Sequence, residues 1–286
     1  MKVRIFTVAY AKHAAWWMKY AMRALGWPAN RAALAEHDVT IDMYAEDSFK
    51  PMVSALAAER GYGLEWHTIK PRPGLNGCTH DALSAAVNEG AVLLPVPGDL
   101  IFGDGSIASL LRMLESGKNR AIAVSHVRVD PSKFEPLFTG ATLSNAELVS
   151  LAIKTMNDQQ MACKLPQGKD RTWMTGISWG EVGPNLYSAT YHLPSICAIV
   201  PLREDVTWYE KNPKSLGAWD HEFPSTLIEP DRYRLIGSSD AAFAVELSLK
   251  TMPKSGYGTH EVDEYRRRLP HNLASKSTLC IWRAAA

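Results

Sequence analysis

Short apolar runs alternate with segments of helical periodicity through the first half of the chain. The apolar and β-branched runs predict strands over Val3–Val8, Asp38–Tyr44, Leu64–Ile69, Ala91–Pro95 and Ala121–Val127. The segments between them predict helices near His13–Leu25 and over Pro51–Arg60, Thr79–Asn88 (capped by Thr79) and Ile107–Leu114. Such alternation is typical of βαβ units, so we expect an α/β fold with a mostly parallel central sheet flanked by helices.

The second half of the chain loses this alternation. Ser144–Met156 predicts an amphipathic helix that begins with a capping-box pattern, Ser144 followed by Glu147. Lys164–Asn185 is dense in Gly and Pro and predicts a long loop of a kind that is usually functional or disordered. Further strands are predicted over Tyr187–Pro201, with a break at Leu193-Pro194, and over Tyr233–Gly237. We expect one domain with a regular first half and an irregular second half.

An acidic residue follows the apolar run Ala91–Pro95. The run ends in Pro97-Gly98, and Asp99 comes next, while Ser106 stands in N-cap position for the following helix. In open α/β sheets, ligands bind beyond the carboxyl ends of the strands. Asp99 is therefore a candidate for holding a metal ion, a sugar hydroxyl or a phosphate-bound cation. The alternative is that Asp99 only closes a turn, because Pro-Gly-Asp is ordinary turn chemistry.

Composition excludes several classes of protein. The 286 residues are 46% apolar and 21% charged, and 31 basic against 30 acidic side chains give a net charge of +1. That balance offers no field to attract nucleic acid or an anionic membrane. No apolar run approaches the roughly 20 residues that span a bilayer, and the N-terminus reads as a strand rather than a signal peptide. The scattered cysteines, without metal-binding spacing, indicate reduced thiols in a cytoplasmic protein.

Common nucleotide and hydrolase motifs are missing from the sequence. There is no GxGxxG after the first strand, no GxxxxGK[ST], no GxSxG and no HExxH. What remains is a set of acidic residues at predicted strand ends, accompanied by two histidines. They are Glu46, Asp47, Asp99, Asp220, Asp240, His192 and His221.

Three stretches of sequence carry a family resemblance. VRIFTVAY opens the chain as a strand that leads into a helix, and THDALSAAVNEGAVLLPVPGDLIFGDGS combines a helix, a strand and an acidic turn. TYHLPSICAIVP, GAWDHEF and LIGSSDAAFAVELS follow. Over Lys2–Ser248 the chain resembles glycosyltransferases of the GT-A type, and its second stretch looks like the surroundings of their Asp-x-Asp motif. The last stretches are similar to a bacterial GT-A-like group with His-Leu-x-Pro and Asp-x-Asp segments. The resemblance implies one domain over 1–286, with a nucleotide-binding half at 1–130 and an acceptor half with a C-terminal extension at 131–286.

The sequence departs from the family at its metal motif. Where many members have two acids, Val96, Pro97 and Gly98 precede the single Asp99. Mg²⁺ and Mn²⁺ prefer oxygen ligands, and one carboxylate needs help from elsewhere. Because the family often completes its metal site from a C-terminal loop, the resemblance implies a Mn²⁺ or Mg²⁺ ion held by Asp99 and His221. The neighbouring residues Trp219, Asp220 and Glu222 form the rest of that predicted cluster.

The resemblance also implies a donor site at the end of the first strand. Thr7, Ala9 and Tyr10 stand where such folds hold the nucleotide base, which Tyr10 would stack on, and Asp47 would accept a hydrogen bond from the ring. The alternatives are that Tyr10 packs in the protein and that Asp47 caps a turn. His80 and Asp81 are further donor candidates, although an Asp in a first helical turn also favours the helix dipole without any function.

The remaining candidates lie in the second half. Trp173 and Trp179 would stack on a sugar or close over the donor as part of a lid, or else pin their loop to the protein. Asp220 and Asp240 are candidate bases for the acceptor hydroxyl, and His192 is a candidate catalytic residue or a structural histidine. The leading hypothesis is a nucleotide-sugar-dependent glycosyltransferase whose acceptor is a glycan, a protein or a modified DNA base. The alternatives are a non-catalytic GT-A-like binding or scaffolding module and a viral transferase acting on a modified DNA base.

Overall fold

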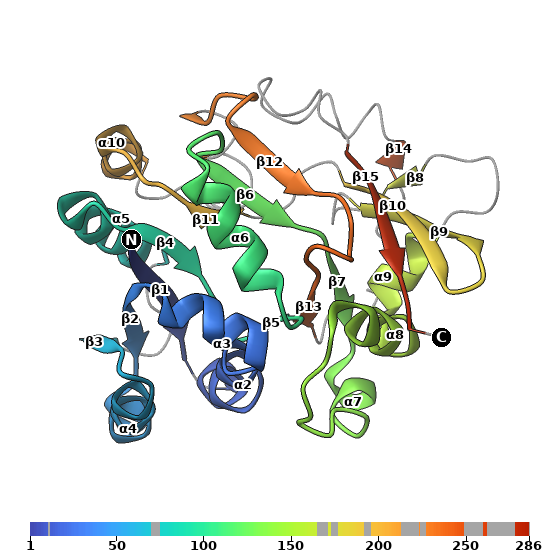
Figure 1. Ribbon diagram of the computed structural model, residues 1–286, viewed down its shortest axis with the longest axis horizontal. Coiled ribbons are helices and arrows are strands. Elements are labelled where there is room, and N and C mark those ends of the chain that lie inside the picture. Colours follow the sequence, from blue (N-terminus) through green and yellow to red (C-terminus); the bar gives the residue numbers. More distant parts are fainter. Residues whose placement is uncertain are drawn as a thin grey trace.

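The structure is a computed structural model that describes residues 1–10, 12–69, 75–164, 171–172, 177–191, 196–212, 223, 227–248, 260–261 and 278–285. Its main element is a seven-stranded sheet in the order β12-β6-β11-β4-β1-β2-β3 (Figure 1). The strands are β12 (Tyr233–Ile236), β6 (Ala121–Val124), β11 (Ile196–Ile199), β4 (Val92–Pro95), β1 (Lys2–Ala9), β2 (Asp38–Ala45) and β3 (Gly63–Thr68). Only β11 runs against its neighbours.

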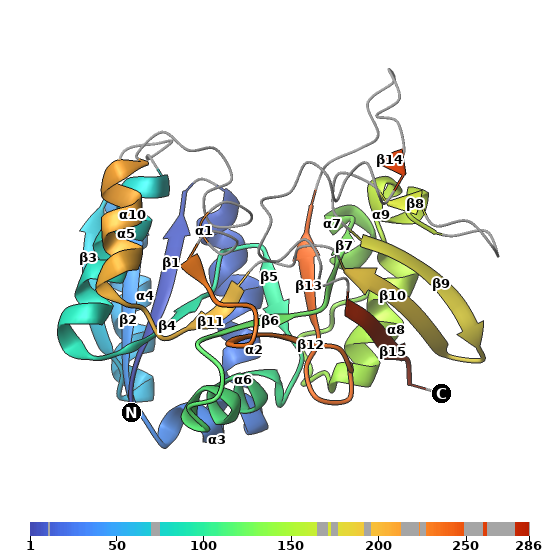
Figure 2. The same cartoon turned by 90° about the horizontal axis from the view of Figure 1, so that it is seen from above.

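Helices cover both faces of this sheet, as its two-sided apolar pattern requires. In β1, Ile5 pairs with Ile41 and Leu94 and packs in one apolar cluster, whereas Phe6 packs in the cluster on the opposite face. The first cluster includes residues of α1 (Lys12–Trp16), the π-helix η1 (Trp17–Ala21), α2 (Met22–Leu25), α3 (Pro28–Ala35), α4 (Lys50–Arg60) and α6 (Ser106–Glu115). The second includes residues of α5 (Leu75–Glu89) and α10 (Arg203–Lys211), which lie side by side (Figure 2). The expected α/β fold with a mostly parallel sheet flanked by helices is confirmed.

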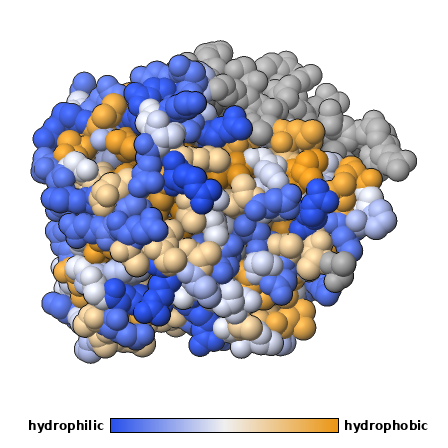
Figure 3. All heavy atoms as spheres, viewed as in Figure 1, coloured by the Kyte–Doolittle hydropathy of each residue, from blue (hydrophilic) through white to orange (hydrophobic). Residues whose placement is uncertain are grey.

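The fold also contains smaller sheets. One joins β5 (Leu100–Phe102), β13 (Ala244–Leu247) and β7 (His126–Val129), and another joins β15 (Thr278–Arg283), β10 (Leu186–Tyr191) and β9 (Ile177–Gly183). A short pair is formed by β8 (Arg171–Thr172) and β14 (His260–Glu261). The other helices are η2 (Asp47–Phe49), α7 (Pro131–Phe134), α8 (Asn145–Thr155) and α9 (Asp158–Ala162). Hydrophilic residues predominate on the side of the molecule where β3, α5 and α10 lie (Figure 3). Among the described residues, no helix combines the length and apolar character needed to cross a membrane.

The segment Ala121–Val127, predicted as one strand, is divided between two sheets. β6 stays in the large sheet beside β11 and β12, whereas β7 begins at His126 and pairs with β13. The division falls at the buried Ser125, whose carbonyl accepts from the backbone N–H of Ala244. Because of this change of partner, β7 carries His126 and Arg128 to the neighbourhood of Asp99.

Two predicted helix starts are wrong and one is confirmed. Ser106 is the first residue of α6, and its hydroxyl donates to the side chain of Asn145 (2.8 Å) instead of capping the helix. Thr79 lies inside α5, where its hydroxyl donates to the carbonyl of Leu75 (2.9 Å). At α8, by contrast, Ser144 and Glu147 form the predicted capping box.

The segment Lys164–Asn185, predicted as a loop, contains strands in its described part. β9 pairs along its length with β10, and Asn185 adopts the left-handed conformation (φ 55°) in the turn between them. Ser178 and Trp179 of β9 are buried, so cross-strand pairing and burial outweigh the turn-like composition.

Candidate functional site

A cavity of about 510 Å³ opens beyond the carboxyl ends of β1 and β4. These two strands are neighbours in the sheet. After β1, the chain adds β2 and β3 on one side of it and then places β4 on its other side, so the strand order reverses between β1 and β4. This is a topological switch point, the place where open α/β sheets bind ligands.

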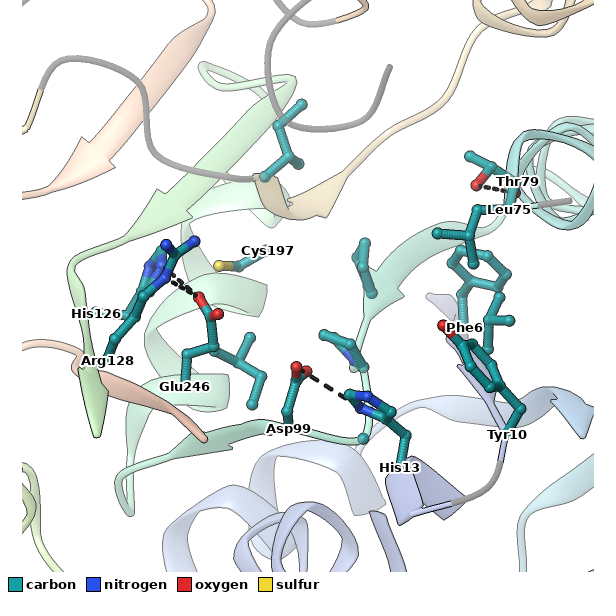
Figure 4. Close-up of a pocket in the computed structure, with 16 residues that line it drawn as sticks. Phe6, Tyr10, His13, Leu75, Thr79, Asp99, His126, Arg128, Cys197 and Glu246 are labelled. Atoms are coloured by element: carbon teal, nitrogen blue, oxygen red, sulfur yellow. Dashed lines mark hydrogen bonds and ion pairs between the residues drawn. The ribbon is translucent and has the colours of Figure 1, made fainter. Parts of the chain in front are cut away.

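One end of the cavity is apolar and aromatic. Phe6, Val8 and Tyr10 line it from β1 and its end, and Leu75 lines it from α5. In Figure 4 the ring of Tyr10 lies beside Phe6, with Leu75 nearby, at this end of the cavity. A flat aromatic face next to apolar side chains suits a planar, partly polar ring such as a nucleotide base.

The other end of the cavity holds charged and titratable side chains. Asp99 lies 3.7 Å (Oδ2) from Nδ1 of His13, and Glu246 accepts a hydrogen bond from Nε of Arg128 (3.1 Å) and lies 3.6 Å from Nε2 of His126. Figure 4 shows Asp99 between His13 on one side and Glu246 on the other. The small sheet creates this grouping, since Glu246 pairs with Arg128 across β13–β7 and with Leu100 across β13–β5.

The two carboxyl groups have different acidities. Burial, together with the negative charge of Glu246, raises the pKa of Asp99 to about 7. Burial also acts to raise the pKa of Glu246, but the contact with His126 and the charge of Arg128 outweigh it and lower that pKa to about 2. Burial lowers the pKa of His13. At neutral pH the site therefore holds one fixed carboxylate and a second that titrates near that pH, a perturbation that is common at functional sites.

Of the residues predicted to bind the donor, Asp99 and Tyr10 line the cavity. Thr7 is buried beneath it, and its hydroxyl donates to the carbonyl of Val96 (2.8 Å), which ties the end of β1 to the segment after β4. Ala9 is buried in the apolar cluster on the other face of the sheet. Both residues support the strand ends, and neither lines the cavity.

Asp47 lies at the start of η2 and is not among the cavity residues. Its Oδ1 accepts from Oγ1 of Thr68 (2.6 Å) and from Nε1 of Trp66 (3.0 Å), and these bonds lower the pKa of Asp47. The ring N–H that binds Asp47 in this structure is thus that of the Trp66 indole on β3. Its predicted contact with a nucleotide base stays a prediction.

His80 and Asp81 lie on α5, next to the cavity residue Thr79, but do not line the cavity. Nδ1 of His80 is 2.9 Å from Oδ1 of Asp81, and its Nε2 is 3.6 Å from Glu210 on α10. Their contacts join the two helices, and their predicted part in donor binding stays a prediction.

Asp240 and Trp179 lie away from the cavity in the described structure. The Asp240 carboxylate is exposed and 3.5 Å from Nε of Arg283. Trp179 is 2% exposed, donates from Nε1 to the carbonyl of Gln160 (2.8 Å) and packs near Trp282. This placement corresponds to the packing alternative for Trp179. The other predicted residues, His192, Asp220, His221 and Trp173, with Trp219 and Glu222, lie outside the described residues.

Sequence reasoning missed His13, His126, Arg128 and Glu246. A signal was present in two strands: His126 and Arg128 alternate with valines, and Glu246 interrupts the apolar run Ala244–Leu247. Alternation places such polar residues on one strand face. Only the pairing of β13 with β5 and β7 shows that these faces meet beside Asp99.

Among its described residues, the cavity offers a divalent cation one free carboxylate ligand, that of Asp99, which other residues would have to complement. Mg²⁺ and Mn²⁺ take oxygen ligands, and burial together with the negative charge of Glu246 raises the pKa of Asp99, so that a bound cation would favour its carboxylate form. Asp99 is the ligand that stays available, because Glu246 is engaged by Arg128 and His126. A second group of ligand atoms, on Asp42, Glu65 and His67, lies outside the cavity lining, with all three atoms within 4.8 Å of one another.

Comparisons with known proteins give structural likenesses at low identity. No protein-family model and no curated protein matches the chain. Over 93% of its length, it is similar to S. aureus TarS 1-349 in complex with UDP-GlcNAc (11% identity, TM-score 0.44) and to the mannosyltransferase PcManGT from Pyrobaculum calidifontis in complex with GDP-Man and Mn²⁺ (16%, 0.41). It is similar over the same share to GalNAc-T7 with UDP, GalNAc and Mn²⁺ (11%, 0.48). The chain spans 64%, 60% and 47% of the lengths of these three proteins. At these identities and TM-scores the function of the chain does not follow from its structural neighbours.

Proposed function

We propose that this chain is a glycosyltransferase that takes its sugar from a nucleotide-sugar donor. The observation that carries the proposal is the cavity at the switch point between β1 and β4, which is aromatic at one end and charged at the other. A nucleoside diphosphate sugar has the same division, with a flat base at one end and a diphosphate further along. The resemblance of the sequence to the GT-A type supports the same class.

In this proposal the base lies against Tyr10 and the apolar end, and the diphosphate lies beside Asp99. Arg128 stands at the charged end, where its guanidinium is only partly used by Glu246 and offers further N–H donors to phosphate oxygens. His13, next to Asp99, adds a polar contact at the turn where β1 leads into α1. These residues bind and orient the donor.

Asp99 would hold the Mn²⁺ or Mg²⁺ ion, which when bound supplies positive charge to the leaving diphosphate. Glu246 keeps Arg128 and His126 in place on the opposite side of Asp99. For the base that accepts the proton of the acceptor hydroxyl, we retain the sequence candidates Asp220 and His192; Asp240, the third candidate, lies exposed beside Arg283 and away from the cavity. The acceptor remains one of the three classes named above: a glycan, a protein or a modified DNA base.

The proposal is tested by the release of nucleoside diphosphate from a panel of UDP-, GDP-, CDP- and TDP-sugars with Mn²⁺ present. We expect turnover of at least one donor, by slow hydrolysis or by transfer to added acceptors. Binding of a donor without any turnover would favour the alternative of a non-catalytic binding module. Absence of both binding and turnover would contradict the proposal.

A further inference from the structure

A second group of charged side chains lies on β1, β2 and β3, outside the cavity lining. In the parallel register, Asp42 pairs with Glu65 and Tyr44 pairs with His67. Paired residues and residues two apart along a strand point to the same face of a sheet. Asp42, Glu65 and His67 therefore share one face, on which Arg4 of β1 also lies.

The carboxylates of this group are each divided between two partners. Arg4 binds one oxygen of each carboxylate, Oδ2 of Asp42 (3.1 Å) and Oε2 of Glu65. The remaining oxygens face the imidazole of His67, whose Nε2 is 3.0 Å from Oδ1 of Asp42 and 3.6 Å from Oε1 of Glu65. One guanidinium thus fixes the orientation of both carboxylates, and three potential ligand atoms converge.

These atoms approach one another without a hydrogen bond between Asp42 and His67. Asp42 is completely buried, and within the described part of the chain neither its Oδ1 nor Nε2 of His67 has a hydrogen-bond partner, although they are only 3.0 Å apart. The geometry does not align an N–H with the oxygen, and buried polar atoms left in this way call for an explanation. An ion bound to both atoms at once would satisfy them.

The charge of the group is also unbalanced. Arg4 contacts three carboxylates, because Nη1 also binds Glu89 (2.7 Å). One guanidinium thus serves three carboxyl groups. A dipositive ion among Asp42, Glu65 and His67 would add positive charge where one guanidinium is shared by three carboxyl groups.

We propose that Asp42, Glu65 and His67 form a zinc site, with Arg4 as the residue that positions the two carboxylates. One imidazole nitrogen and two carboxylate oxygens are ligands that Zn²⁺ accepts, with bonds of about 2.0–2.2 Å and about 3.3 Å between neighbouring ligand atoms of a tetrahedron. The separations from His67 of 3.0 and 3.6 Å bracket that value. The side chains of Glu65 and His67 are 45% and 32% exposed, so an ion can enter and a water molecule can complete the tetrahedron.

The site is connected to the cavity through stacked rings. The ring of His67 lies flat on Tyr44, with centroids 4.1 Å apart and an interplanar angle of 9°, and Tyr44 meets the ring of Phe6 edge-on at 5.7 Å. Phe6 lines the cavity. Zinc would fix the edge strand β3 against β2 and, through these rings, stiffen the wall of the cavity. The inference does not depend on the proposed glycosyl transfer.

The test is a titration of the metal-free, EDTA-treated protein with Zn²⁺, followed by calorimetry and by thermal unfolding. We expect the protein to bind one equivalent of Zn²⁺ and its melting temperature to rise as a result. His67→Phe, which removes the nitrogen ligand but keeps a ring on Tyr44, should abolish this binding. Glu65→Gln should weaken the affinity for this Zn²⁺ ion by about 10-fold or more. Loss of a residue that only hydrogen-bonds to a metal ligand already costs about 10-fold to 100-fold in metal affinity. Co²⁺ in place of Zn²⁺ should give visible absorption bands that His67→Phe abolishes.

Three variants separate this site from other zinc binding. Glu89→Gln changes a partner of Arg4 that does not face His67, and His37→Ala removes a histidine elsewhere, so both should retain the equivalent. Asp99→Asn should retain it too, because Asp99 belongs to the cavity. The proposal is overturned if the unaltered protein binds no Zn²⁺, if His67→Phe binds it as well as the parent does, or if the binding disappears in Asp99→Asn or His37→Ala.

Discussion

Asp99 and Glu246 lie at the same end of the cavity, yet their pKa values are displaced in opposite directions, to about 7 and about 2. Their partners explain the difference. Glu246 is held by Arg128 and His126, whereas Asp99 has His13 at 3.7 Å as its ion-pair partner among the described residues and feels the negative charge of Glu246. The site thus keeps one carboxylate neutralised by the protein and leaves the other to be neutralised by a proton or by a ligand. This asymmetry gives the first two predictions.

Asp99 should lower the stability of the folded protein at high pH. Its pKa in the folded state is raised from 3.8 to about 7, so the folded protein binds the proton more tightly than the unfolded chain does. The free energy of unfolding then falls as pH rises from about 4 to about 7. Asp99→Asn should remove this loss, by no more than about 4 kcal/mol, and raise the melting temperature more at pH 8 than at pH 5. Asp240→Asn, at an exposed carboxylate, is the control and should show little change at either pH. Equal effects of Asp99→Asn at both pH values would contradict the assignment.

Arg128 should stabilise the protein mainly by compensating Glu246. Arg128→Gln leaves the partly buried carboxylate of Glu246 with one fewer partner, and we expect a loss of about 1–3 kcal/mol in the free energy of unfolding. The double variant Arg128→Gln/Glu246→Gln no longer holds that charge and should recover much of the loss. Denaturant unfolding of both variants and of Glu246→Gln gives the coupling directly. If the double variant is as unstable as the sum of the single variants, the two side chains are not coupled.

Gly98 should be required for the position of the Asp99 turn. A Cβ atom on Gly98 would collide with the backbone carbonyl of His13, which has little freedom to move at the start of α1. Gly98→Ala should cost about 1–3 kcal/mol of stability, as overpacking commonly does, and weaken donor binding. The control is Gly77→Ala in α5, where a Cβ meets nothing within 4 Å and alanine favours the helix. The idea fails if the two alanine variants have the same melting temperature.

Tyr10 should contribute to donor binding through its ring. Tyr10→Ala should weaken binding of a nucleoside diphosphate by about 10-fold to 100-fold, the range expected when a base loses an aromatic partner worth 1–3 kcal/mol. Tyr10→Phe keeps the ring and should bind nearly as the parent does. Calorimetric titration with the preferred nucleotide measures both. Similar affinities for Tyr10→Ala and the parent would show that the base lies elsewhere.

The large sheet could be predicted from the sequence because its signals are local. Strands β4 and β6 are short apolar runs, β1, β2 and β3 carry apolar or β-branched residues among polar ones, and strand–helix alternation predicts parallel neighbours. The exchange of partners at Ser125 could not be predicted, since it depends on pairing between β7 and β13, which are far apart in the chain. The same applies to β9, where burial of Trp179 outweighs a Gly-rich composition.

The candidate site could be predicted only in part. Asp99 and Tyr10 could be predicted because ligands commonly bind at the carboxyl ends of parallel strands. Glu246 and Arg128 reach Asp99 through the small sheet, and no spacing in the sequence shows that contact. Asp47 and Thr7, which follow the same strand-end rule, turn out to bind Thr68 and Val96. A strand end narrows the search, but long-range pairing decides which of its side chains line the cavity.

The central claim, that Asp99 lies at the donor diphosphate, is tested most directly by calorimetric titration of UDP, GDP, CDP and TDP in the presence of Mn²⁺. The unaltered protein should bind at least one of them, and Asp99→Asn, which keeps the shape of the side chain but removes its charge, should bind that nucleotide at least 10-fold more weakly in Mn²⁺ while unfolding cooperatively. Asp240→Asn should match the parent. If Asp99→Asn binds the nucleotide as tightly as the parent does, or if the parent binds none of the four, the assignment of this cavity as a nucleotide-sugar site is wrong.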